Sequence, residues 1–176
     1  MPVILQTERL IVRTWSPDDE EVGYRIWSDP EVMRYIGTGQ PKNLEETRAW
    51  IGRTSAHQEA HGFGFWAVVE KKSSRLLGNC GMGYQRDGGL PLEFGYTLAR
   101  SHWGRGYATE AAAACVRYAF DNLRFPQLSA RVDSRNVASQ RVLEKIGFVY
   151  EREEQLAAEI NFWYVANAGA VDQKQT

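Results

Sequence analysis

The stretch "HWGRGYATEAA", residues 102–112, places two glycines and an arginine directly before an alanine-rich run. The segment "EFGYTL" at 93–98 has strand character, so the chain is predicted to pass from a strand through a loop into a helix. Unpaired backbone N–H groups at a helix start attract phosphate, and glycines allow a close approach of the backbone to a ligand. Two interpretations stay open at this point: a phosphate-binding loop with Arg105 as a charged contact, or an ordinary turn.

Two common nucleotide-binding motifs do not fit this loop. A Walker-type loop needs Gly-Lys followed by Ser or Thr, whereas residues 104–109 read Gly-Arg-Gly-Tyr-Ala-Thr. A dinucleotide-binding loop needs a third glycine at the position that Thr109 occupies. A nucleotide-binding module is kept as an alternative that competition by ATP, and not by coenzyme A, would reveal.

The composition describes an ordinary soluble domain. The chain has 176 residues, of which 43% are hydrophobic and 24% charged, enough for one domain with a sizeable core. A net charge of −1 argues against general binding to nucleic acid or to acidic membranes. Cys80 and Cys115 lie in apolar runs, which indicates buried free thiols in a reducing cytoplasm. No secretory leader and no membrane span is recognised, so a cytoplasmic location is expected.

Hydrophobic periodicity and turn signals predict an alternating chain of strands and helices. Helices are expected to begin at Ser16 and Asp29, where a cap residue is followed by proline. The separators 71–74 and 87–89 predict hairpin turns, hence an antiparallel meander, and later strand–helix–strand crossings predict a mixed sheet. Strands are predicted over 9–15, 63–70, 75–84, 91–98, 128–133, 148–153 and 160–167, and further helices over 43–60, 106–123 and 136–147.

A second cluster, "NVASQRVLEKIGF" at 136–148, follows a predicted strand and opens a helix. Asn136 and Ser139 lie one helical turn apart, so their side chains face the same way near the helix start. Asn136 is either a plain helix cap or a ligand contact, and Ser139 is either a ligand contact or a solvent-facing residue.

Together with residues 103–108, this cluster resembles the GNAT superfamily of N-acetyltransferases. The family's Q/R-x-x-G-x-G/A loop matches 103–108, with Trp103 in place of Gln or Arg and Ala108 at the small final position. The pattern N-x-x-S-x-x-V-L-E-K-x-G-F and "TERLIVR" at 7–13 are similar to the RimJ/RimL branch, the ribosomal-protein N-terminal acetyltransferases. The resemblance extends over nearly the whole chain, to about Asn167.

The resemblance implies an α/β (α+β) fold. Its central sheet would be mixed and mostly antiparallel, with about seven strands, splayed near the fourth strand, and with helices on both faces. Residues 1–167 would form a single acyl-CoA N-acyltransferase (GNAT) domain and 168–176 a flexible C-terminal tail. A homodimer is compatible with this family.

The resemblance also implies acetyl-CoA as co-substrate, with its pantetheine arm in the gap of the sheet like an added strand. The region of Leu98 would supply backbone groups to pantetheine and to the acetyl carbonyl, residues 105–109 would hold the pyrophosphate, and Asn136 and Ser139 would border the thioester. The cofactor-binding residues are therefore expected to be Leu98, Gly104, Arg105, Gly106, Tyr107, Ala108, Thr109, Asn136 and Ser139.

The implied reaction is direct transfer of acetyl to a primary amine. Glu93 is the candidate base, acting through water, unless it is a charged residue on the outward face of its strand. Many relatives place a tyrosine seven residues after the asparagine of the second motif, where this chain has Leu143. Ser139 is the remaining candidate donor to the sulfur, with solvent as the alternative, because a thiol pKa around 8.5 makes a tolerable leaving group.

The acceptor is expected to be a protein N-terminus or a small amine. A non-catalytic acyl-CoA-binding or regulatory domain on the same fold is the alternative, because the usual tyrosine is missing. No metal is expected, since the three histidines form no ligand pattern with the cysteines, and His57 and His61 are expected to be solvated. Three tryptophans, Trp27, Trp50 and Trp66, are expected in the core, with an acceptor pocket as the alternative.

Overall fold

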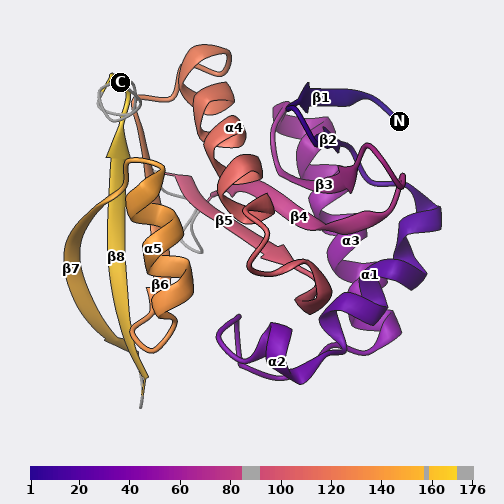
Figure 1. Ribbon diagram of the computed structural model, residues 1–176, viewed down its shortest axis with the longest axis horizontal. Coiled ribbons are helices and arrows are strands. Elements are labelled where there is room, and N and C mark those ends of the chain that lie inside the picture. The colour runs from indigo at the N-terminus through magenta and orange to yellow at the C-terminus, as the bar shows by residue number, and fades with distance from the viewer. Residues whose placement is uncertain (85–91, 157–158, 170–176) are drawn as a thin grey trace.

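The computed structural model describes residues 1–84, 92–156 and 159–169 (Figure 1). They form one eight-stranded sheet in the order β1-β2-β3-β4-β5-β6-β8-β7. All neighbouring strands are antiparallel except the parallel pair β5–β6, which confirms the expected mixed, mostly antiparallel sheet. The strands are β1 (Val3–Gln6), β2 (Leu10–Arg13), β3 (Phe65–Glu70), β4 (Leu76–Gly83), β5 (Leu92–Leu98), β6 (Gln127–Asp133), β7 (Val149–Leu156) and β8 (Glu159–Asn167).

The sequence-based prediction found every strand except β1, which lies at the edge of the sheet. Its four residues are exposed or half-buried and show no alternation that would have marked them. The turn at 71–74 joins antiparallel β3 and β4 as expected. The predicted turn at 87–89 lies outside the described residues, as does most of the predicted tail at 168–176.

The helices begin where the sequence places its cap residues. Asn43 and Glu46 form a capping box at the start of the longest helix, and Ser16 caps a short 3-10 turn. Asp29 caps the next short helix, with Pro30 in its first turn. The helices are η1 (Pro17–Asp19), α1 (Glu20–Trp27), α2 (Pro30–Met33), α3 (Leu44–His61), η2 (Arg100–His102), α4 (Tyr107–Asp121) and α5 (Val137–Lys145).

Helices cover both faces of the sheet and create two hydrophobic cores. Alternate residues of β3 serve the two cores: Trp66 and Val68 pack in the core that contains α4, whereas Ala67 and Val69 pack in the core that contains α1 and α3. Figure 1 shows α4 and α5 in front of the central strands. Cys80 is a buried free thiol of the larger core, as expected, and burial raises the pKa of this thiol.

Strands β4 and β5 approach each other closely at Gly78. A Cβ atom placed on this glycine would lie 2.0 Å from the backbone oxygen of Thr97, and the glycine has a φ of +152°. Gly78 pairs with Leu98 in the register of the two strands. Only a residue without a side chain therefore fits here, and this position sets the spacing beside the end of β5.

Gly78→Ala is expected to lower the free energy of unfolding by roughly 3 kcal/mol, because the new methyl group adds overpacking and backbone strain. Gly52→Ala is the matched control, since Gly52 lies in α3 and a Cβ atom placed there would meet nothing within 4 Å. That change should stabilise the protein by about 0.5–1 kcal/mol through helix propensity. Urea denaturation of both variants measures the contrast, and equal midpoints would contradict the close approach.

Candidate active site

Strands β5 and β6 separate soon after they meet. They pair only at Leu92 with Leu128 and at Glu93 with Ser129, although both strands continue for several residues. No described strand pairs with this side of residues 94–98. This is the fourth strand of the sequence-based prediction, so the expected splay is confirmed, and it leaves an open strand edge inside the molecule.

The open edge presents backbone groups to the gap. The N–H of Ala99 donates to the carbonyl of Leu77, toward β4. Because successive residues of a strand direct their backbone groups to alternate sides, those of Leu98 and Tyr96 point toward the gap. The Leu98 carbonyl accepts a hydrogen bond from the indole N–H of Trp103 at 2.7 Å. The edge can therefore pair with an extended ligand through the Leu98 N–H and the groups of Tyr96.

The gap continues into a cleft of about 650 Å³ between β5, the loop after it and α5, called here the α4–α5 cleft. Eight of the nine predicted cofactor-binding residues line it. The exception is Arg105, which is exposed and does not line the cleft. The eight are Leu98, Gly104, Gly106, Tyr107, Ala108, Thr109, Asn136 and Ser139.

The glycine loop enters α4 through two left-handed residues. Gly104 has a φ of +71° and Gly106 a φ of +79°, a conformation that favours glycine. Gly106 is the N-cap of α4 and supplies no side-chain cap, so the backbone N–H groups of the first turn are left for another partner. Residues 107–109 of that turn line the cleft.

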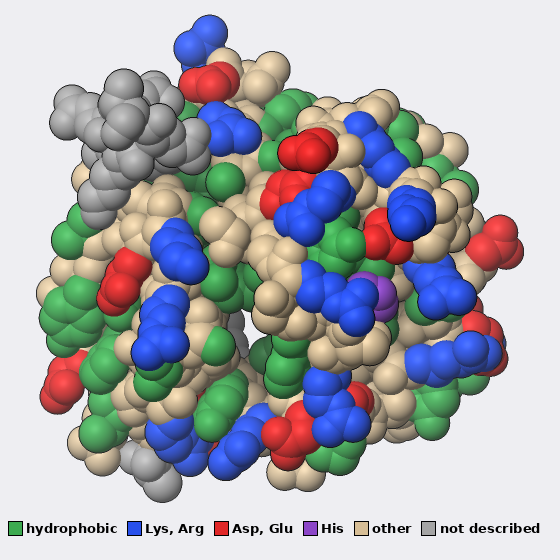
Figure 2. Space-filling view, viewed as in Figure 1, with side chains coloured by type: hydrophobic (Ala, Val, Ile, Leu, Met, Phe, Trp, Pro, Cys, Tyr) green, Lys and Arg blue, Asp and Glu red, His purple; other side chains and the backbone are tan. Residues whose placement is uncertain are grey.

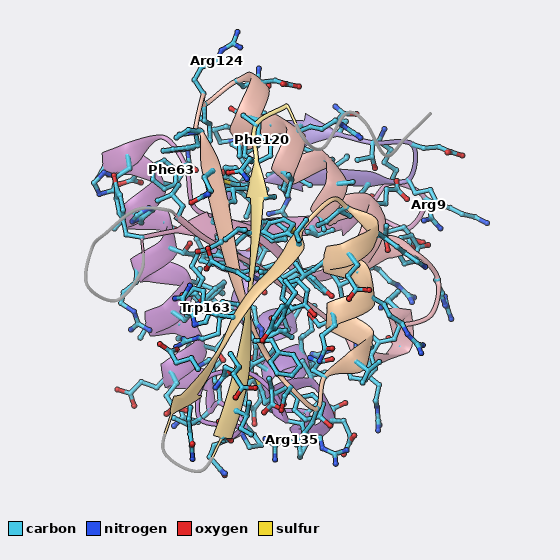
Figure 3. All side chains as sticks on the ribbon, turned by 90° about the vertical axis from the view of Figure 1, so that its left-hand side faces the viewer. Arg9, Phe63, Phe120, Arg124, Arg135 and Trp163 are labelled. Carbon is cyan, nitrogen blue, oxygen red and sulfur yellow. The ribbon has the colours of Figure 1, made fainter. Side chains whose placement is uncertain are left out.

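Arg9, directly before β2, holds this loop in place. Its Nη1 donates to the carbonyl of Arg105 at 2.9 Å, and its guanidinium lies 4.4 Å from the centre of the Tyr107 ring. Its Nε donates to Glu110 at 2.6 Å, an ion pair between residues far apart in the chain. Figure 3 shows Arg9 beside the N-terminal end of α4. The sequence motif at 7–13 pointed to a family, but gave Arg9 no role.

Glu110 stays charged at neutral pH. Partial burial by itself raises the pKa of its carboxyl group, but hydrogen bonds from Thr7 and from Arg9 outweigh this and lower the pKa. The charged carboxylate therefore holds the start of β2 against the first turn of α4.

On the other wall of the cleft, Asn136 caps α5. Its Oδ1 accepts the backbone N–H of Ser139 at 3.1 Å, so the helix-cap interpretation is confirmed, and both residues also line the cleft. The hydroxyl group of Tyr96 reaches across the gap and donates to Ser139 Oγ at 3.1 Å. Burial raises the pKa of Tyr96 to about 12, so this hydroxyl keeps its proton. Sequence reasoning missed Tyr96. Leu143 is buried, at 3% exposure.

The α4–α5 cleft has a positive lining. Arg34, Arg131, Arg141 and Lys145 contribute to it, against one acidic residue, Glu31, among the described lining residues. Arg141 and Lys145 are one turn apart on α5, so their side chains share a face. Figure 2 shows a hollow in this face of the molecule with Lys and Arg side chains around it. The arrangement attracts an anionic ligand.

A second cavity of about 610 Å³ opens on the opposite face of β5 and is called here the aromatic pocket. Trp27, Trp50 and Phe65 line it, with ring centres 4.8 Å apart for the two tryptophans. Trp27 is at the same time a core residue. Trp66 lies fully in the core, where its indole N–H donates a hydrogen bond to Gln58 Oε1. Trp66 is therefore a core residue as expected, Trp50 lines the cavity, and Trp27 does both.

Glu93 faces this aromatic pocket. Its carboxylate lies 3.7 Å from Arg131 and its side chain is 28% exposed, so it is not simply a solvated charge on an outward face. The aromatic pocket and the α4–α5 cleft share a wall, formed by residues 34–36 and 94–97 and by Arg131. Two ligands, one from each cavity, can therefore meet at β5.

The histidines form a different arrangement from the expected one. The ring of His57 lies 4.6 Å from that of His61 and 5.0 Å from that of Phe63, and its Nε2 is buried with no hydrogen-bond partner among the residues that the structure describes. The expectation of solvation is wrong for His57, because Phe63 and Tyr84 pack around it. Burial, followed by the nearby His61, lowers the pKa of His57. Within 1–84, 92–156 and 159–169, no three metal-binding side chains gather at one place.

Comparison with known proteins identifies the class of this fold and site. Residues 9–149 match the model of the acetyltransferase (GNAT) domain, and the chain belongs to this family. It is 35% identical over 150 residues to the uncharacterized protein YkkB of Bacillus subtilis (strain 168), covering 84% of this chain and 86% of the relative. It is 31% identical to the uncharacterized N-acetyltransferase p20 of Bacillus licheniformis, covering 84% and 83%.

Among solved structures, RimL, a ribosomal-protein acetyltransferase in complex with coenzyme A, is similar in fold. The TM-score is 0.80 with 15% sequence identity, over 96% of this chain and 99% of RimL. Among the described residues, no helix combines the length and apolar character that a membrane crossing requires.

Arg9→Leu is expected to weaken coenzyme A binding by roughly tenfold, because the loop before α4 loses its hydrogen bond and ring contact. Arg25→Leu is the matched control, since Arg25 is an exposed residue of α1 with its side chain 75% exposed. Isothermal titration of both variants with coenzyme A measures the difference. Equal affinities would show that Arg9 does not hold the loop.

Glu110→Gln is expected to destabilise the protein at neutral pH but not in acid. A carboxyl group whose pKa is lowered by folding stabilises the folded state above its ordinary pKa of about 4.3, and this stabilisation is lost as the pH falls through the lowered value. The Tm difference between wild type and variant should therefore shrink below about pH 4. A difference that is constant from pH 7 to pH 3 would contradict this role.

Proposed function

We propose that this protein transfers the acetyl group of acetyl-CoA to a primary amine by direct attack. The observation that carries the proposal is the shared wall at 94–97, where the α4–α5 cleft and the aromatic pocket meet. One cavity is positively lined and suits the phosphates of acetyl-CoA, and the other offers aromatic surface and a carboxylate to an amine. Membership in the GNAT family supports the same chemistry.

The α4–α5 cleft fits acetyl-CoA at three places. The pantetheine arm pairs with the backbone groups of Tyr96 and Leu98, as an added strand would. The pyrophosphate binds the first-turn N–H groups of α4, where the glycines leave room. Arg141 and Lys145 add positive charge to the cleft. Arg105, within the glycine loop, is the predicted side-chain contact with the pyrophosphate.

Transfer forms a C–N bond and breaks the C–S bond of the thioester. The amine nitrogen attacks the carbonyl carbon, and the oxyanion is stabilised by a backbone N–H of the open edge near Leu98. The amine loses one proton to Glu93 through a water molecule. The sulfur departs as the thiolate of coenzyme A, which takes a proton from solvent to become the thiol. Arg131 balances the charge of Glu93 before the proton arrives.

Ser139 is placed to donate a hydrogen bond to the departing sulfur. Because Tyr96 donates to Ser139 Oγ, the hydrogen of Ser139 is free to point into the cleft. Tyr96 thus positions Ser139, in a chain that has Leu143 where many members of the family have a tyrosine. With a thiol pKa around 8.5, the sulfur needs only this stabilisation to leave.

The acceptor is a protein N-terminus or a small amine. The fold is shared with RimL, a ribosomal-protein acetyltransferase, which supports the first class and the RimJ/RimL branch. The ionisable lining of the aromatic pocket is balanced, with three basic and three acidic side chains among the described residues, so it selects no strongly charged acceptor. These are Arg34, Lys42, Arg131, Glu93, Asp133 and Glu159.

Gly106→Glu is expected to abolish the thermal stabilisation that acetyl-CoA gives the wild type, because a carboxylate at this position repels the pyrophosphate. The matched control is Gly62→Glu, since Gly62 has nearly the same φ, +78° against +79°, and caps α3 away from the cleft. Both variants carry similar backbone strain, although a Cβ atom at position 106 would also lie 3.4 Å from Arg9 Nη2. A wild type whose Tm does not respond to saturating acetyl-CoA would defeat the proposed function.

Glu93→Gln is expected to lower kcat by about a hundredfold while acetyl-CoA still binds, because the base is lost. Release of free thiol from acetyl-CoA is measured against peptide N-termini and small amines, from pH 6 to pH 9. The non-catalytic alternative predicts binding of acetyl-CoA without thiol release from any member of the panel.

A further inference from the structure

Three aromatic rings from three different elements form one wall of the aromatic pocket. They belong to Trp27 of α1, Trp50 of α3 and Phe65 of β3, and are called here the aromatic wall. The ring centre of Trp50 lies 4.8 Å from that of Trp27 and 6.3 Å from that of Phe65. Trp50 and Phe65 are only half-buried, so both keep accessible surface, and both line the pocket. A ligand in the pocket can therefore contact the wall.

Trp15 supports this wall without lining the pocket. Its indole N–H donates to the backbone carbonyl of Phe65 at 2.7 Å. Its ring centre lies 5.7 Å from that of Trp27 and 5.6 Å from that of Trp50. Because the rings are already packed together, a ligand meets a preformed surface whose ordering costs little free energy on binding.

Two glycines allow the ring of Phe65 to lie beside Glu93. A Cβ atom placed on Gly83 would lie 3.3 Å from this ring, and one placed on Gly95 would lie 3.5 Å from it. Gly83 pairs with Glu93 across β4 and β5, and Gly95 follows Glu93 by two residues on the same face of β5. By strand geometry, the Cα atoms of both glycines lie roughly 5–7 Å from that of Glu93. An amine whose nitrogen and aromatic ring are two carbons apart matches this separation.

The charges of the aromatic pocket favour a neutral group beside the wall. Basic and acidic side chains are present in equal numbers among the described lining residues. A carboxylate on the acceptor would be repelled by the acidic side chains, and a second ammonium group by the basic ones. An apolar ring has no such conflict, and its burial removes apolar surface from water.

We propose that the acceptor is a primary amine whose nitrogen is joined to an aromatic ring through two carbons, and that the aromatic wall binds this ring. The inference rests on the proposed function, in which the amine enters through the aromatic pocket. Arylalkylamines and peptides that begin with phenylalanine share this chemistry. In both, contact of the ring with the wall brings the nitrogen toward Glu93 and the shared wall at 94–97.

The π face distinguishes an aromatic ring from an aliphatic group of the same size. Aromatic pairs in tilted or edge-to-face arrangements attract each other beyond the burial of apolar area. Within the wall, the planes of neighbouring rings are tilted by 58° and 50°, so a ligand ring meets both faces and edges. This attraction corresponds to a preference of roughly twofold to tenfold over a saturated ring.

Phenethylamine and cyclohexylethylamine test the preference, because they share the spacer and the number of carbons. Thiol release gives the ratio of their kcat/KM values, and comparison of this ratio between protein variants cancels the difference in basicity of the amines. Phe65→Leu and Trp50→Leu are each expected to lower the ratio several-fold, because a ring of the wall is lost. The Kd of acetyl-CoA should stay unchanged, since neither residue lines the α4–α5 cleft.

Phe125→Leu is the matched control. Phe125 is also half-buried but lines neither cavity, so this variant should keep the ratio of the wild type. A second pair of substrates, peptides that begin with phenylalanine or cyclohexylalanine, distinguishes the two sources of the ring. A higher kcat/KM for phenethylamine assigns a small amine, and a higher value for the phenylalanine peptide assigns a protein N-terminus.

Calorimetric titration with phenethylamine, with and without coenzyme A, measures binding to the wall independently of turnover. Its Kd is expected to rise several-fold in both wall variants. The inference is overturned by a ratio or a Kd that Phe65→Leu and Trp50→Leu leave unchanged, or by tighter binding of cyclohexylethylamine than of phenethylamine to the wild type. Failure of the proposed function differs: the wild type would not bind acetyl-CoA, or would release no thiol with any amine, whereas the titration would still report on the wall.

Discussion

The separation of β5 and β6 is the constraint on which the site depends. The two strands are parallel and share only two residue pairs, whereas β6 shares seven with β8 on its other side. The firm pairing with β8 holds β6 in place and leaves the edge of β5 open. A ligand at the open edge of β5 can contact side chains that point to either face of the sheet. The two cavities meet at this edge.

Polar contacts between distant segments then shape the two sides of that edge. On the side of α4, Arg9 connects the start of β2 to the glycine loop and to Glu110. Across the gap, Tyr96 connects β5 to Ser139 of α5. Each contact positions a group that itself touches the cleft, and Tyr96 also packs against the larger hydrophobic core. The polar contacts here position the site, and hydrophobic packing in two cores supports the sheet.

The elements were predictable because their signals are local. Helices were predicted from their cap residues, and strands from alternation and from the separator at 71–74. The exposed edge strand β1 shows no such pattern and was missed. Residues of the two segments that carried the resemblance, 103–108 and 136–148, line one and the same cleft. The contacts that complete the site join residues 101 positions apart, for Arg9 and Glu110, and 43 positions apart, for Tyr96 and Ser139. No periodicity within a segment encodes such pairs.

The sequence by itself determined every strand but β1, most helix starts, the glycine loop before α4 and the cap of α5, because these follow from the chemistry of a few neighbouring residues. The tertiary structure alone decided which charges line the cleft, that Glu93 lies beside Arg131 and that Tyr96 reaches Ser139. Alternation along a strand tells which side chains share a face. What that face meets depends on how distant segments pack together.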